Sequence, residues 1–150
     1  MLTEHIKARG MVSFVLTDAT GQIKEQQDHN LVVNVGLAYI ASRMKDATAT
    51  VMSHMAVGIG TTAAAGAQTA LVTESARVAL TSSTIVTTSV TNDSIQYVAT
   101  FAPGSGTNAL TEAGLFNAAS AGTMLARTVF PVINKGALDT LTITWKITVA

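Results

Sequence analysis

The chain has 150 residues, of which 48% are hydrophobic, and its nine basic and nine acidic residues give a formal net charge of zero. This length suits one domain with a real core, and the charged fraction of 12% is about half that of ordinary soluble domains. Nucleic acid and anionic membrane surfaces attract proteins through clustered basic residues, so we expect neither as a partner. So neutral a chain exposes apolar or hydroxyl-rich surface, which we expect other protein copies to cover.

The chain contains no cysteine, which excludes a disulfide framework, a thiolate metal site and a cysteine nucleophile. Residues 1–10 carry mixed charges and lead into only a short apolar run, so they are typical of neither a secretory signal nor a membrane span. We expect an N-terminal arm over 1–10, a single domain over 11–150, and folding in the cytoplasm where the chain is made.

The first predicted element is a β-hairpin. Residues 11–17 are apolar and β-branched, and the Asp-Ala-Thr-Gly sequence at 18–21 is a strong turn signal. The chain from Gln22 returns as the second strand, and a polar stretch then ends at Asn30.

One helix is predicted after this hairpin. Asn34 is a suitable N-cap, and basic residues near the other end favour the helix macrodipole. The apolar face of this helix, with residues three and four apart, consists of Leu37, Ile40, Ala41 and Met44.

From residue 52 onward the pattern is that of β-strands separated by Gly, Ser, Thr and Asn. Asn92 and Asp93 predict a tight turn between strands 84–91 and 94–101. The predicted core face of the second of these strands carries Ile95, Tyr97, Ala99 and Phe101. The other strands are predicted over 52–60, 110–118, 123–133 and 138–149.

The last of these strands alternates most regularly. Threonines occupy most of one side, and uncharged hydroxyls suit either solvent or a neighbouring subunit. The strands together predict an all-β fold with one short α-helix, a two-sheet β-sandwich of jelly-roll-like type. The apolar side of the last strand carries Leu141, Ile143, Trp145, Ile147 and Val149.

Patterns typical of catalysis or metal binding are weak. Gly58 and Gly60 follow a predicted strand, but the next residues lack the lysine or third glycine of a nucleotide-binding loop, which favours a flexible connection. His5, His29 and His54 lie in different kinds of segment without metal-ligand spacing, and we expect His54 to be a half-buried, hydrogen-bonded strand residue. We expect no enzyme, no catalytic or metal-binding residue, no cofactor and no small-molecule substrate.

Three further side chains have a structural and a functional interpretation. Glu112 and Arg127 are isolated charges in apolar strands, which favours a structural cross-strand pair or two solvated side chains over an intersubunit contact. Trp145 is in register with core residues, so packing is favoured over a role as a sugar-binding platform.

The chain resembles small accessory proteins of tailed-bacteriophage virions over residues 30–149. The resemblance lies in EAGLFNA, followed by ARTVF and a closing DTLTITWKIT. It implies a β-sandwich that joins the virion as an oligomer, without catalytic residues or a cofactor.

Two placements follow from this resemblance. The favoured one is a capsid cement or decoration subunit on the outer capsid surface, which bridges copies of the major capsid protein and contacts copies of itself. The alternative is a tail, neck or fibre-attachment protein, although the chain lacks the internal repeats of fibres. A carbohydrate-binding module is a lesser alternative.

Two segments are predicted to contact a partner because a core does not need them. The N-terminal arm combines apolar anchors with donors, and the glycine-rich loop after residue 101 is adaptable. The predicted interface residues are Leu2, Ile6, Lys7, Arg9, Pro103, Ser105, Thr107 and Asn108.

Overall fold

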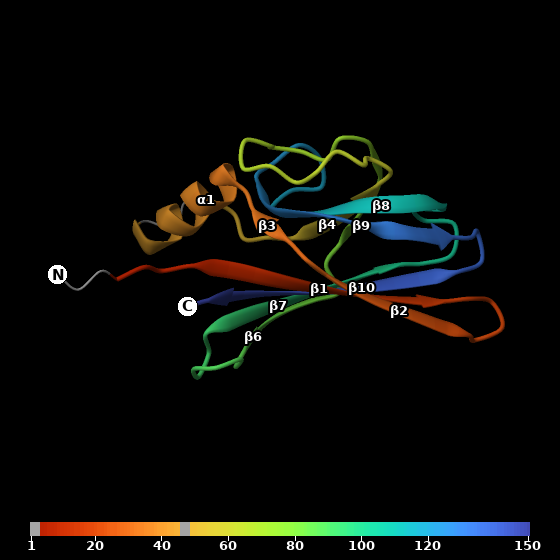
Figure 1. The fold of residues 1–150 in the computed structure, drawn as a ribbon, viewed down its shortest axis with the longest axis horizontal. Coiled ribbons are helices and arrows are strands. Elements are labelled where there is room, and N and C mark those ends of the chain that lie inside the picture. The colour runs from red at the N-terminus through yellow and green to blue at the C-terminus, as the bar shows by residue number, and fades with distance from the viewer. Residues whose placement is uncertain (1–3, 46–48) are drawn as a thin grey trace.

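The computed structural model describes residues 4–45 and 49–150, which form two five-stranded antiparallel sheets packed face to face (Figure 1). Sheet A consists, from edge to edge, of β2 (Ile23–His29), β1 (Ala8–Thr17), β10 (Thr140–Val149), β7 (Ser94–Phe101) and β6 (Ser82–Val86). Sheet B consists of β3 (Leu31–Val32), β9 (Met124–Lys135), β8 (Asn108–Phe116), β4 (His54–Gly58) and β5 (Glu74–Ala79). The helix α1 (Asn34–Lys45) lies between β3 and β4 in the chain. The predicted all-β two-sheet sandwich with one short helix is confirmed.

Consecutive strands pair within one sheet four times, as β1–β2, β4–β5, β6–β7 and β8–β9. A jelly roll is instead wound from two Greek keys. The β-sandwich prediction is therefore confirmed. The strands are connected mainly as consecutive antiparallel pairs, two in each sheet, and not in the jelly-roll order.

The predicted N-terminal arm over residues 1–10 overlaps the first strand, which begins before residue 11. Strand β1 begins at Ala8, which pairs with Val149, because the backbone ladder with β10 continues to the end of that strand. Backbone bonds extend the pairing by one more residue, with Lys7 N donating to Ala150 O at 2.6 Å and Ala150 N donating to Lys7 O at 2.8 Å.

The predicted tight turn at Asn92 and Asp93 is wrong. Strand β6 ends at Val86, and residues 87–93 form a wider loop. The Asp93 carboxylate accepts backbone N–H bonds from Thr88, Ser89 and Val90 at 2.8 to 2.9 Å. These bonds replace ladder pairing, so the predicted strand could not continue to residue 91.

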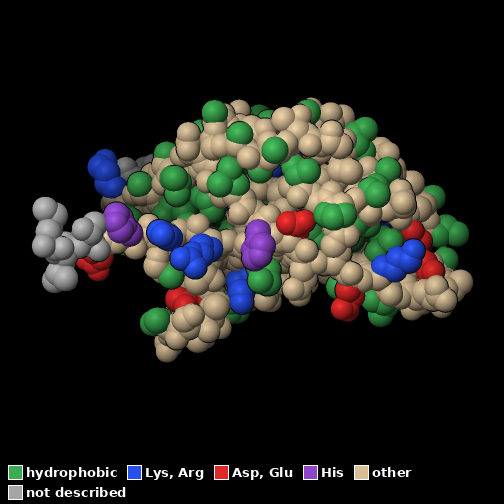
Figure 2. All heavy atoms as spheres, viewed as in Figure 1, with side chains coloured by type: hydrophobic (Ala, Val, Ile, Leu, Met, Phe, Trp, Pro, Cys, Tyr) green, Lys and Arg blue, Asp and Glu red, His purple; other side chains and the backbone are tan. Residues whose placement is uncertain are grey.

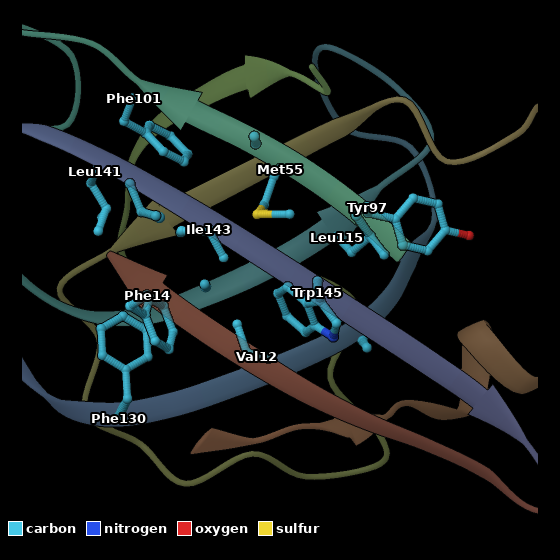
Figure 3. Close-up of a cluster of buried hydrophobic side chains, with 14 of the residues drawn as sticks. Val12, Phe14, Met55, Tyr97, Phe101, Leu115, Phe130, Leu141, Ile143 and Trp145 are labelled. Atoms are coloured by element: carbon cyan, nitrogen blue, oxygen red, sulfur yellow. The ribbon is translucent and has the colours of Figure 1, made fainter. Parts of the chain in front are cut away.

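The main core lies between the inner faces of the two sheets (Figure 3). Trp145 is fully buried at its centre and its indole Nε1 donates to Asn30 Oδ1 at 3.1 Å, which confirms the packing interpretation. Phe14 and Phe130 contact each other from opposite sheets with ring centroids 4.3 Å apart. The predicted alternation of β10 is confirmed as far as Ile147, after which Val149 is 44% exposed.

Sheet B is covered on its outer face as well, by residues 59–73 between β4 and β5 (Figure 1). Leu71 from this segment packs in a second buried cluster with Phe116 and Met124. Strands covered on both faces carry continuous apolar runs, which explains why β8 and β9 do not alternate as β10 does.

Helix α1 spans the predicted region, but the predicted apolar face is only partly confirmed: Ile40 packs against the main core, whereas Ala41 is exposed. Leu37 is 51% exposed and Met44 79% exposed, whereas Gly36 is the buried residue of the helix. A Cβ atom on Gly36 would lie 2.1 Å from the backbone oxygen of Leu125. The helix therefore approaches β9 through its glycine, and this contact sets the rotation of the helix about its axis.

Candidate functional site

The Glu112 and Arg127 side chains form a fully buried ion pair on the outer side of sheet B. Arg127 donates through Nη2 at 2.7 Å and Nε at 3.0 Å to Glu112 Oε2. The same carboxylate accepts backbone N–H bonds from Gly60 at 3.0 Å, Val72 at 3.0 Å and Thr73 at 2.7 Å. The predicted cross-strand pair is confirmed, and it also joins both ends of the 59–73 segment to the sheet.

The rest of the Arg127 guanidinium binds the middle of the same segment. Its Nη1 donates to Thr62 O and to Gln68 Oε1, both at 2.9 Å. Burial raises the pKa of Glu112, but the Thr73, Arg127, Val72 and Gly60 donors outweigh it and hold this pKa below its usual value. The pair thus stays ionised and fastens the covering segment to sheet B.

The other polar residues singled out in the sequence lie apart. Gly60 belongs to this fastened segment, so the prediction of a flexible connection is replaced by a hydrogen-bonded one. His54 is half-buried in β4, and its Nδ1 lies 2.8 Å from Ser53 Oγ, as predicted. Within residues 4–45 and 49–150, no three His, Asp or Glu side chains group as metal ligands would.

Sheet A, in contrast, has an outer face that none of residues 4–45 and 49–150 covers with a further layer (Figure 1). The register places uncharged side chains side by side across β1, β10 and β7. We define the hydroxyl face as these two rows, Ser13–Thr144–Val98 and Val15–Thr142–Thr100. All six side chains are half-buried or exposed, and Thr100 Oγ1 lies 3.4 Å from Thr142 Oγ1.

An apolar groove of about 670 Å³ lies between α1 and sheet A, and Leu125 of β9 also lines it. Ile85, Ile95 and Ile147 line it from sheet A, and Tyr39, Ile40 and Met44 line it from the helix. The Tyr97 side chain also lines it, with its hydroxyl directed away from the core cluster (Figure 3). Burial, together with Tyr39, raises the pKa of Tyr97 to about 12, so the groove presents a neutral phenol.

The predicted interface residues of the arm that the structure describes lie at the same end of sheet A as this groove. Leu2 lies outside the described residues, whereas Ile6 is 76% exposed and Lys7 and Arg9 are exposed. Ile6, Lys7 and Arg9 line a second groove, of about 470 Å³, together with Leu37.

The predicted loop residues lie at the other end of the sheet, where Phe101 pairs with Leu141. Pro103, Thr107 and Asn108 are exposed and Ser105 is half-buried. The structure therefore does not join the loop and the arm into one surface.

In Figure 2 most charged side chains lie in the lower half of the molecule and a few at the end where Figure 1 shows α1, while the broad upper surface has almost no charge in that view. Part of this upper surface is the 59–73 segment, in which no residue is charged. The protein thus has two low-charge surfaces, one made by a covering segment and one by bare strands.

Comparison with known proteins adds no relative: no family, no curated protein and no solved structure matches the chain. None of the helices in the described residues is long and apolar enough to cross a membrane.

The apolar groove is the feature that the sequence analysis missed. Ile95 alternates with Tyr97, Ala99 and Phe101, so the pattern predicts its burial, but Ile95 is 38% exposed and, with the 65% exposed Ile85 beside it, lines this groove. What leaves them partly uncovered is the position of α1, which local sequence does not encode. The only signal was the helix itself, which carries more apolar residues than its contact with β9 buries.

Proposed function

We propose that this protein is a structural subunit of a tailed-bacteriophage virion, a cement or decoration protein that docks on assembled major capsid protein through the hydroxyl face. The observation that carries the proposal is this bare face of sheet A, because the chain covers the outer side of sheet B with its own residues and leaves this one open.

The chemistry of the face suits a broad, repeated contact. Its β-branched threonines and valines hold few rotamers, so ordering them on a partner costs little entropy. None of the six side chains is charged, so the two rows themselves bring no ionised group into the contact, and Glu25 of β2 lies beside Val15 at the margin of the face. Lys146, in the next row along β10, provides a donor at the rim.

Placement on the particle is tested by electron cryomicroscopy of the virion that contains the protein. The proposal expects many copies across capsomer junctions, with sheet A toward the shell. Density confined to the tail or the portal vertex would make the protein a tail, neck or fibre-attachment subunit instead.

The docking face is tested by adding purified protein to shells assembled without it. Thr144→Glu places a carboxylate at the centre of the hydroxyl face, and we expect occupancy to fall at least about tenfold, since an unpaired interfacial charge costs about 2 kcal/mol or more. Thr69→Glu is the matched control, because Thr69 is exposed on the covering segment. If Thr69→Glu abolishes docking and Thr144→Glu does not, the 59–73 surface is the docking face and the proposal is wrong.

A further inference from the structure

The four edge strands of the sandwich differ in how they are protected from pairing with another chain. Strand β2 carries Lys24, Glu25 and Asp28, and β5 carries Glu74 and Arg77, while β3 has only two residues. Charged side chains and short length are the usual means by which edge strands avoid pairing. Strand β6 carries no charge, and among the described strands it pairs only with β7.

The side chains of β6 are also unusually open. Four of its five residues are exposed, and Ile85 is 65% exposed although it pairs with Ile95 on the inner side of the sheet. Thr84 pairs with Gln96 and so lies on the outer side. The strand stands at the margin of sheet A, and no element of the described part of the chain lies beyond it (Figure 1).

We propose that β6 is a dimerisation strand, which pairs antiparallel with β6 of a second copy about a two-fold axis at Thr84. Antiparallel strands are related by a two-fold axis, so two identical copies supply each other's missing backbone partners. Thr84 then faces Thr84 of the second copy, and Ser83 faces its Ile85. No charged residue meets another anywhere in this register.

The pairing also accounts for the position of the apolar groove. Ser83 and Ile85 both line it, so joining two β6 strands brings the grooves of both copies into one continuous trough. Each Ile85 gains a cross-strand neighbour about 5 Å away, and the two A sheets become one sheet. The inference deepens the proposed function, since one sheet from two copies doubles the area that docks on a shell.

Disulfide trapping tests the strand pairing directly, because the chain has no cysteine of its own. Thr84→Cys is expected to give a covalent dimer under mild oxidation, since residues that face each other across a two-fold axis come within disulfide range. Gln27→Cys is the matched control, since Gln27 is an exposed residue on the outer side of the charged edge strand β2. Failure of Thr84→Cys to cross-link, or equal cross-linking of both variants, overturns the inference.

Sedimentation of the free protein tests the same contact without any cysteine. Ile85→Lys is expected to convert dimer to monomer, whereas Ile23→Lys, at a residue 60% exposed on β2, is expected to leave the dimer intact. A monomeric wild type, or a dimer that survives Ile85→Lys, contradicts the inference. Neither experiment uses capsid shells, so the dimer is tested independently of the proposed docking on a shell.

Discussion

Glu112 is an ionised carboxylate that solvent does not reach, and five donors surround it. We expect Glu112→Gln to lower the free energy of unfolding by about 3 to 5 kcal/mol, because Arg127 remains as a buried charge without its counterion. The control is Glu74→Gln, which breaks the more exposed Glu74–Arg77 pair and is expected to cost less than about 1 kcal/mol. Urea denaturation measures both, and equal losses would mean that the buried pair does not fasten the 59–73 segment.

Asp93 holds the loop between β6 and β7 through hydrogen bonds that depend on the ionisation of its carboxyl group. Backbone donors from Val90 and Ser89, helped by Thr88 and the Ser94 hydroxyl, hold the pKa of this carboxyl far below its usual range despite some desolvation. Because the pKa of Asp93 is lower in the folded state, its carboxylate stabilises the folded protein at any pH above the unfolded-state pKa of about 3.9. This stabilisation is lost only as the pH falls through the lower folded-state pKa.

We therefore expect the amides of residues 88–90 to remain protected from hydrogen exchange at about pH 3, below the unfolded-state pKa. Asp93→Asn should remove this protection at about pH 3 and about pH 5 alike, because the amide is a weaker acceptor. Asp18→Asn, in the turn of another hairpin, should leave these amides unchanged. Protection that is already lost in the wild type near pH 4 would show that the carboxylate does not hold this loop.

At the scale of the element, helix propensity and tertiary packing predict opposite effects for substitutions in α1. Propensity alone predicts that Gly36→Ala stabilises the helix by about 1 kcal/mol and that Leu37→Ala removes a packed side chain. The structure predicts the reverse: Gly36→Ala costs about 1 to 3 kcal/mol because the added methyl meets the Leu125 backbone, and Leu37→Ala costs less than about 1 kcal/mol. Thermal and urea unfolding of the two variants decide between these outcomes.

The same distinction explains how much of the fold the sequence could predict. The sequence predicts the inward residues of β10 and β7 correctly from Leu141 to Ile147 and from Tyr97 to Phe101, because there each strand has one covered face and burial follows a period of two. The extent of β6 was not found, since Thr87 to Thr91 keep a strand-like composition while the Asp93 side chain holds their backbone in a loop. The groove is not predicted for a related reason, because Ile95 has the pattern of a core residue and its partial exposure depends on where α1 lies in space.

At the scale of the whole molecule, the separation of charge from the hydroxyl face leads to a prediction about salt. If the neutral rows of sheet A make the contact, raising the salt from about 0.05 M to about 0.5 M should change the occupancy of protein on shells by less than about twofold, since little charge is there to screen. Docking through the basic arm residues Lys7 and Arg9 would instead weaken at least about tenfold over the same range. Lys7→Gln combined with Arg9→Gln separates these cases at low salt, because it should leave docking through the hydroxyl face intact and weaken docking through the arm. Strong salt dependence that this double variant abolishes would move the contact from sheet A to the arm.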